Sequence, residues 1–112
     1  MAGKPKLRSR ITTDGLDRVP HRAFMRAMGV DDEAMAKPFV GVVTTAGEMT
    51  PCNMNLTPQS AAVKEGVTAA GGTPREFTTI TVSDGISMNH QGMKFSLISR
   101  EVIADSVELV VR

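Results

Sequence analysis

The chain carries a single cysteine, Cys52, in the tripeptide at 51–53 (PCN), where a segment typical of a buried strand gives way to polar residues. A second strand-like segment ends at residues 83–85 (SDG), which contain Asp84. A thiolate is a soft metal donor and a carboxylate is a hard one. Because α/β folds build their sites where neighbouring strands end, Cys52 and Asp84 are the best candidates for chemistry.

From the residues alone, each candidate also has a simpler explanation. A lone cysteine can be a small packing residue, a reactive thiol, or one ligand of a site completed elsewhere. An aspartate before glycine after a strand usually serves the turn. His90 stands in a polar loop and is more typical of a hydrogen-bonding residue than of a base or ligand, so we leave it out of the site. For Met88 and Met93, filling of the core is a better interpretation than contact with a cofactor.

The composition limits the possible functions. The 112 residues are 41% hydrophobic and 22% charged, with a net charge of +1, which predicts a soluble protein of at most one domain. The basic segment 4–10 is short and interrupted by Pro5 and Ser9, so we interpret it as a solvated arm. No apolar run approaches the roughly 18 residues of a membrane span, and no secretory signal follows the basic start. We therefore expect a cytoplasmic protein that binds neither nucleic acid nor membrane.

The elements that must position the two candidates follow a β/α rhythm. Apolar spacing and capping residues predict helices, whereas β-branched apolar runs bounded by turn residues predict strands. The predicted elements are a helix at 18–28 capped by Gly29, a strand at 38–44 buried on both faces, a loop at 45–56, a helix from the N-cap Thr57 to Gly71-Gly72, a strand at 77–82, a loop at 83–92 and a helix at 95–111.

Two strands joined by a helix form a βαβ unit. Its right-handed crossover lays the strands parallel, so the loops after both strands meet at one edge. We therefore expect Cys52 and Asp84 on the same rim. Two strands and a final helix without a stop signal would leave sheet edges and apolar helix faces uncovered. We expect the chain to be part of something larger.

Several segments together carry a further signal, and the block at 84–108 is long enough to be specific. They are RSR and TT within 8–13, PCNMNL at 51–56, AAGG at 69–72, SDGISMNHQGM at 83–93 and SREVIADSVE at 99–108. Together they resemble the amino-terminal part of dihydroxy-acid dehydratases, within the larger family of dihydroxy-acid, phosphogluconate and sugar-acid dehydratases. Asn89 stands where many members have glycine, a difference that concerns the local turn and neither candidate ligand.

The resemblance implies an α/β fold, with residues 1–112 forming a partial α/β/α sandwich. They would be the incomplete amino-terminal cluster- and magnesium-binding domain of a two-domain dehydratase. It also implies an iron–sulfur cluster, of the [2Fe–2S] kind in many members, beside a Mg²⁺ ion. Cys52 matches one of three cluster ligands, and Asp84 matches a magnesium ligand. The other ligands and the catalytic base match no residue of this chain, so no catalytic residue is assigned.

The implied activity is that of a hydro-lyase of branched-chain amino-acid biosynthesis, which converts 2,3-dihydroxy-3-methyl acids into 2-oxo acids. The full-length enzyme would be a homodimer. The residue types suit this reaction, because magnesium prefers oxygen donors and an iron–sulfur cluster is held by thiolates. Two alternatives stay open. One is a sugar-acid dehydratase, and the other is a noncatalytic remnant, since one cluster ligand of three cannot hold a cluster.

Overall fold

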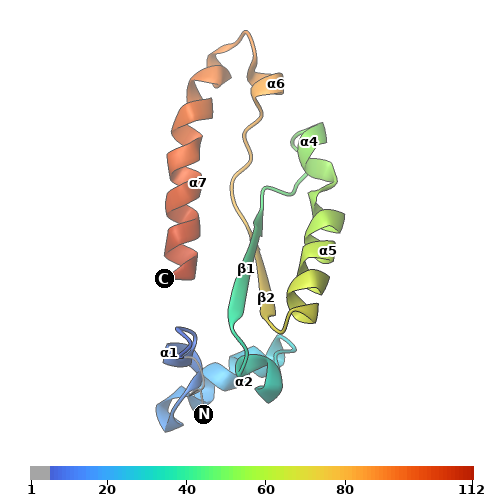
Figure 1. Ribbon diagram of the computed structural model, residues 1–112. Helices are drawn as coiled ribbons and strands as arrows, with labels where there is room; N and C mark the ends of the chain where they lie inside the picture. The colour runs from blue at the N-terminus through green and yellow to red at the C-terminus, as the bar shows by residue number, and fades with distance from the viewer. Residues whose placement is uncertain (1–5) are drawn as a thin grey trace. The chain divides into compact units, whose positions relative to one another are not determined.

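A computed structural model describes residues 6–112, so Lys4 and Pro5 of the predicted arm lie outside the described residues. The elements are, in chain order, α1 (Arg10–Thr13), the 3₁₀ helix η1 (Leu16–Arg18), α2 (Val19–Ala27), α3 (Asp32–Met35), β1 (Phe39–Thr44), α4 (Pro51–Met54), α5 (Leu56–Ala69), β2 (Thr73–Thr78), α6 (Asp84–Ser87), the 3₁₀ helix η2 (Gln91–Lys94) and α7 (Phe95–Val111) (Figure 1). No helix within 6–112 has the length and apolar character to cross a membrane.

The described chain divides into two compact units. The first comprises the described residues up to Val40 together with Gly66–Pro74, and the second comprises Gly41–Glu65 together with Arg75–Arg112. Cys52 and Asp84 both belong to the second unit.

The two strands form a parallel pair, as predicted. The Thr73 N–H donates to the Pro38 carbonyl at 2.8 Å, and the Thr79 N–H donates to the Thr44 carbonyl at 3.0 Å. The sequence advances by the same amount on both strands between these bonds, which is the mark of a parallel ladder. The helix α5 connects the strands, so the βαβ unit and the mixed α/β class are confirmed.

Glycine ends two of the predicted helices. Gly29 after α2 has φ +83 and Gly71 after α5 has φ +89, a backbone region that glycine enters without strain. After α5, the Gly71 N–H donates to Thr68 and the Gly72 N–H donates to Val67, which satisfies the last carbonyls of the helix. These caps are confirmed, and α7 has the predicted bounds.

The predictions for two loops, one helix start and one strand are wrong. The predicted loop at 45–56 contains the helical turn α4, and α5 begins at Leu56, so Thr57 lies inside the helix and is not its N-cap. The predicted loop at 83–92 contains the helical turn α6. The predicted strand at 77–82 is replaced by β2 at Thr73–Thr78, because β1 ends at Thr44 and leaves later residues without a ladder partner.

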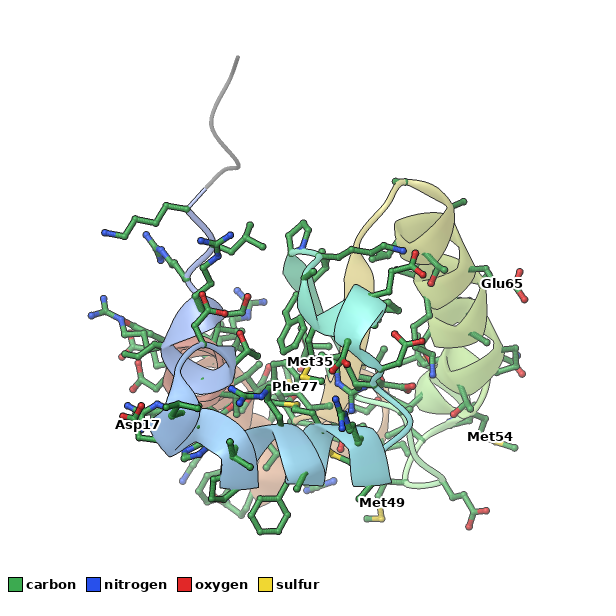
Figure 2. The ribbon with its side chains drawn as sticks, turned by 90° about the horizontal axis from the view of Figure 1, so that it is seen from below. Asp17, Met35, Met49, Met54, Glu65 and Phe77 are labelled. Carbon is green, nitrogen blue, oxygen red and sulfur yellow. The ribbon has the colours of Figure 1, made fainter. Side chains whose placement is uncertain are left out.

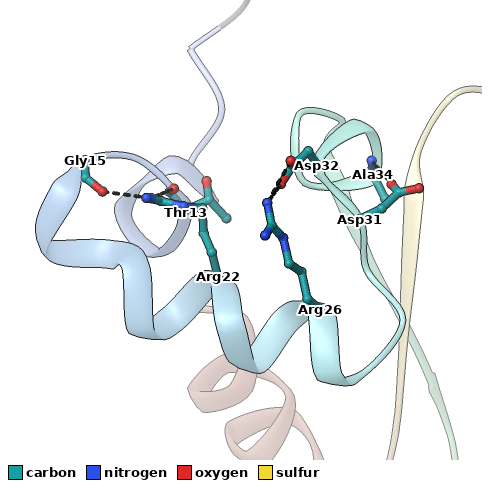
Figure 3. A network of polar contacts seen from close by, with 7 residues as sticks. All are labelled: Thr13, Gly15, Arg22, Arg26, Asp31, Asp32 and Ala34. Carbon is teal, nitrogen blue, oxygen red and sulfur yellow. Dashed lines mark hydrogen bonds and ion pairs between the residues drawn. The ribbon is translucent and has the colours of Figure 1, made fainter.

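The first unit is held together by polar contacts as well as by buried Val30 and Met35. Arg26 of α2 makes a two-oxygen contact with Asp32, at 2.6 and 2.8 Å, and Arg22 donates to the carbonyls of Thr13 and Gly15 (Figure 3). The hydrogen bond from Arg26, together with its charge, holds the pKa of Asp32 below its ordinary value.

Burial differs from the prediction in β1 and at two methionines of the second unit. Val42 of β1 is buried, but Val40 and Val43 are 37% and 39% exposed, so the strand is not covered on both faces. Met88 and Met93 are exposed as well, which contradicts their interpretation as core residues. The described chain supplies one neighbouring strand for β1, so much apolar surface faces solvent, as the uncovered faces in the sequence led us to expect.

Candidate metal centre

Cys52 lies in the helical turn α4, after the carboxyl end of β1. Thr50 is extended, with φ −143 and ψ 152, and Pro51 occupies the first helical position, where its missing N–H costs nothing. The Cys52 thiol is free and exposed. Its neighbours Met49 and Met54 project away from the ribbon and are also exposed (Figure 2). The thiol is therefore presented at the surface of the second unit, and Cys52 is not the buried packing residue of the simpler explanation.

Asn53 fixes the backbone beside the thiol. Its Nδ2 donates to the Thr45 carbonyl at 2.9 Å and contacts the Thr45 hydroxyl at 2.6 Å. Its Oδ1 accepts from the hydroxyl of Thr50, a residue that is 5% exposed. These bonds join the two ends of the segment 45–53. Sequence analysis missed this role, although an asparagine beside the only cysteine was a visible signal.

Asp84 is the first residue of α6 and is exposed. The hydroxyl of Ser96, in the first turn of α7, donates to Asp84 Oδ1. Ser96 is 7% exposed, and its carbonyl accepts from the Ser99 hydroxyl at 2.6 Å. Within residues 6–112 Asp84 Oδ2 has no hydrogen bond or ion pair, so one carboxylate oxygen is anchored and the other is not.

His90 has the hydrogen-bonding role that its surroundings predicted. The Gly92 N–H donates to His90 Nδ1 at 2.9 Å, so the proton of a neutral ring sits on Nε2, which donates to the Ile86 carbonyl at 2.9 Å. A side chain at Gly92 would bring its Cβ within 2.5 Å of the His90 ring. Asn89 has φ +66, a left-handed conformation consistent with a position where glycine is common.

The candidates lie beyond the same end of the strand pair. Figure 1 shows α4 and α6 past the carboxyl ends of β1 and β2. The donors fit the implied groups in type, because an exposed thiol can serve a cluster and a half-anchored carboxylate can serve a hard cation. Within 6–112, however, no three His, Cys, Asp or Glu residues gather to hold a metal. Each implied group therefore has one donor here, and both metal roles stay predictions.

A separate apolar groove of about 630 Å³ lies in the second unit. It is lined by Gly41, Val42, Val43, Thr44, Thr45, Leu56, Gln59, Ser60, Val63, Thr79, Ile103 and Val107. Neither Cys52 nor Asp84 lines it. The groove is thus an uncovered packing face of β1, α5 and α7 and does not contain the candidate ligands.

An ionised contact joins β2 to α5. Glu76 forms an ion pair with Lys64 and accepts from the Ser60 hydroxyl at 2.9 Å. The hydrogen bond from Lys64, and then that from Ser60, lowers the pKa of Glu76 from its ordinary value. This contact, called the Glu76 brace below, links β2 to α5 and includes neither candidate ligand.

Known proteins are closely similar to this chain in sequence. The family model described as dihydroxy-acid/6-phosphogluconate dehydratase, N-terminal, matches residues 37–112. The chain is 72% identical over 110 residues to dihydroxy-acid dehydratase 3 of Bradyrhizobium diazoefficiens, an alignment that covers 98% of this chain and 19% of the relative. It is 64% identical to the dihydroxy-acid dehydratase of Pelagibacter ubique and 60% identical to that of Mycobacterium tuberculosis, covering 97% and 96% of this chain and 19% of each relative.

The fold is that of an α/β protein, with an exposed thiol and an exposed carboxylate beyond the same end of its parallel strand pair. The chain belongs to the dihydroxy-acid/6-phosphogluconate dehydratase family, as the match to more than half of its length shows. It spans about a fifth of the length of the curated relatives it matches, 19% in each case. The predicted resemblance is thereby confirmed.

Proposed function

We propose that this chain supplies one cluster ligand, Cys52, and one magnesium ligand, Asp84, to a dihydroxy-acid dehydratase. The observation that carries the proposal is the placement of an exposed thiol and an exposed carboxylate after the carboxyl ends of parallel strands, in a chain of this family. The identity of 60–72% to relatives named dihydroxy-acid dehydratase favours this activity over that of a sugar-acid dehydratase.

The proposed substrates are 2,3-dihydroxy-3-methyl acids, and the pathway is branched-chain amino-acid biosynthesis. The reaction removes the C2 proton and the C3 hydroxide, and the resulting enol becomes a 2-oxo acid. When bound, a [2Fe–2S] cluster and Mg²⁺ would supply the Lewis acidity that this elimination needs. We also propose, from the family resemblance, that the whole enzyme is a cytoplasmic homodimer.

The chain's own residues have distinct tasks in this proposal. Cys52 must give up its thiol proton to become a thiolate donor, and its position on the exposed turn α4 leaves the sulfur accessible for that role. Asp84 offers its second oxygen, Oδ2, while the Ser96 hydroxyl holds Oδ1 and so restricts rotation of the carboxylate. A restricted carboxylate keeps its geometry when a hard cation binds.

A hybrid enzyme tests the proposal. The matched segment of the Bradyrhizobium relative is replaced by this chain, and the hybrid is assayed for 2-oxo acid formation from 2,3-dihydroxyisovalerate. We expect an active hybrid whose Cys52→Ser variant loses the visible absorption and bound iron of the cluster, because a hydroxyl is a hard and normally protonated donor.

Met54→Leu is the matched control for Cys52→Ser, because Met54 lies on the same turn and is 61% exposed. This control should retain iron and activity. Full iron content in the folded Cys52→Ser hybrid would refute the role of Cys52 as a ligand.

A further inference from the structure

A single carbonyl group connects the two candidate ligand segments. The Thr45 carbonyl accepts from Asn53 Nδ2 at 2.9 Å and from the Thr81 hydroxyl at 3.0 Å. Asn53 follows Cys52 directly in α4, and Thr81 lies on the extended segment that leads from β2 to Asp84. All of these residues belong to the second unit.

The Asn53 side chain is specifically suited to this position. Asn53 Nδ2 donates to the Thr45 carbonyl and lies 2.6 Å from the Thr45 hydroxyl, while Oδ1 accepts from Thr50. The backbone also takes part, since the Asn53 N–H donates to the Thr50 carbonyl at 3.2 Å. Only an amide can donate twice on one side and accept on the other, so an aspartate of the same size cannot replace it.

Partial burial raises the free-energy cost of losing these hydrogen bonds. Thr50 is buried, and Asn53, Thr45 and Thr81 are half-buried, so a lost partner is only partly replaced by water. Cys52 itself makes no recorded side-chain contact within residues 6–112 that would orient its thiol. The position of the sulfur is therefore set by the backbone of α4, which Asn53 fastens to the end of β1.

We propose that Asn53 is a positioning residue that holds Cys52 in place for the cluster, and that the Thr45 carbonyl links it mechanically to Thr81 and the Asp84 segment. This inference rests on the proposed function, because it takes Cys52 and Asp84 as ligands. It adds that the two metal segments are not independent. A disturbance at Asn53 reaches both the cluster and the magnesium site.

The test uses the hybrid dehydratase with Asn53→Asp, which keeps the size and the acceptor but removes both donors. The matched control is Asn55→Asp, which adds the same charge near Cys52 at an exposed residue for which no side-chain hydrogen bond is recorded within 6–112. Two readouts do not depend on turnover. They are the rate at which a chelator removes the cluster, followed by visible absorption, and the affinity for Mn²⁺ in place of Mg²⁺, followed by the free-ion signal in electron paramagnetic resonance.

We expect Asn53→Asp to release its cluster about 10- to 100-fold faster than Asn55→Asp, which is the usual cost of losing a partner that orients a metal ligand. Its Mn²⁺ affinity should also fall, at a temperature at which both variants remain folded. A cluster release rate and an Mn²⁺ affinity equal to those of Asn55→Asp would overturn the inference.

Thr81→Val keeps the proposal falsifiable if Asn53→Asp does not fold. Valine preserves the branched shape and removes only the hydroxyl that donates to Thr45. We expect Mn²⁺ binding to weaken by about threefold to tenfold, with faster cluster release. Unchanged values in this folded variant would overturn the link. Retention of the cluster by Cys52→Ser would instead refute the proposed function. If Cys52→Ser loses the cluster but Asn53→Asp releases it at the rate of the parent, only this inference is refuted.

Discussion

The segments around Cys52 and Asp84 follow the two strands in equivalent places, yet they are stabilised differently. The Cys52 thiol is free, and the neighbouring Asn53 fastens the backbone to Thr45. Asp84 is held through its own carboxylate, by the hydroxyl of Ser96 at the start of α7. The cysteine is thus positioned indirectly and the aspartate directly. The difference suits the donors, because a carboxylate has a second oxygen to offer and a thiolate has only one atom.

Among variants that test this difference, Asp84→Asn in the hybrid enzyme is expected to have the largest effect on activity. Asparagine retains the turn preference and the volume but removes the negative charge that a hard divalent ion needs. Activity should fall by about 100-fold or more, at or above the upper end for residues that only orient a ligand. The cluster should remain, and high magnesium should restore part of the activity.

The control for this variant is Asp105→Asn, which makes the same change at an exposed position of α7. It should leave the magnesium dependence unchanged. Normal activity of Asp84→Asn at ordinary magnesium would reduce Asp84 to a turn residue. A failure to fold would mean that its contact with Ser96 is structural.

A smaller effect on activity is expected from Ser96→Ala. This variant tests the hydrogen bond that positions Asp84 apart from the carboxylate itself. The carboxylate remains, but Oδ1 loses its donor and the side chain gains rotational freedom. The magnesium concentration for half-maximal activity should rise about tenfold, with unchanged activity at saturation. Ser106→Ala is the control, since the Ser106 hydroxyl donates to a backbone carbonyl of the same helix. An equal shift in both variants would show that the anchor does not position Asp84.

The sequence allowed the scaffold of both segments to be predicted better than their local structure. The β/α order, the parallel pairing, the glycine caps and the bounds of α7 follow from apolar period and turn residues, which are local properties. The turns α4 and α6 were missed because four-residue helices carry no apolar period. The extent of β2 was missed because the pairing with β1 sets where the strand begins and ends, so Pro74 and Glu76 lie in a strand that their residue types disfavour.

The candidate metal donors could be predicted from the sequence, but the residues that hold them in position could not. Cys52 and Asp84 can be selected from residue type and position after a strand. The partners Thr45, Thr81 and Ser96 cannot, because each lies far along the chain from the group it contacts. Threonine and serine also occur in many roles. Only the folded backbone shows that a threonine carbonyl is shared by the two ligand segments.

The smallest effect is expected from Glu76→Gln. This change weakens the Glu76 brace between β2 and α5 and leaves both ligand segments unchanged. The folded-state pKa of Glu76 lies below its ordinary value of 4.5, owing first to Lys64 and then to Ser60. The ionised contact therefore stabilises the fold above pH 4.5, and this stabilisation is lost as the pH falls toward the folded-state pKa. In the hybrid, Glu76→Gln should lower the melting temperature slightly at pH 7, and the difference from the parent should shrink near pH 4. Glu65→Gln, an exposed change on α5, should show neither effect. Cluster release and Mn²⁺ affinity should match the parent in both variants, and a change in either for Glu76→Gln would mean that the brace also supports the ligand segments.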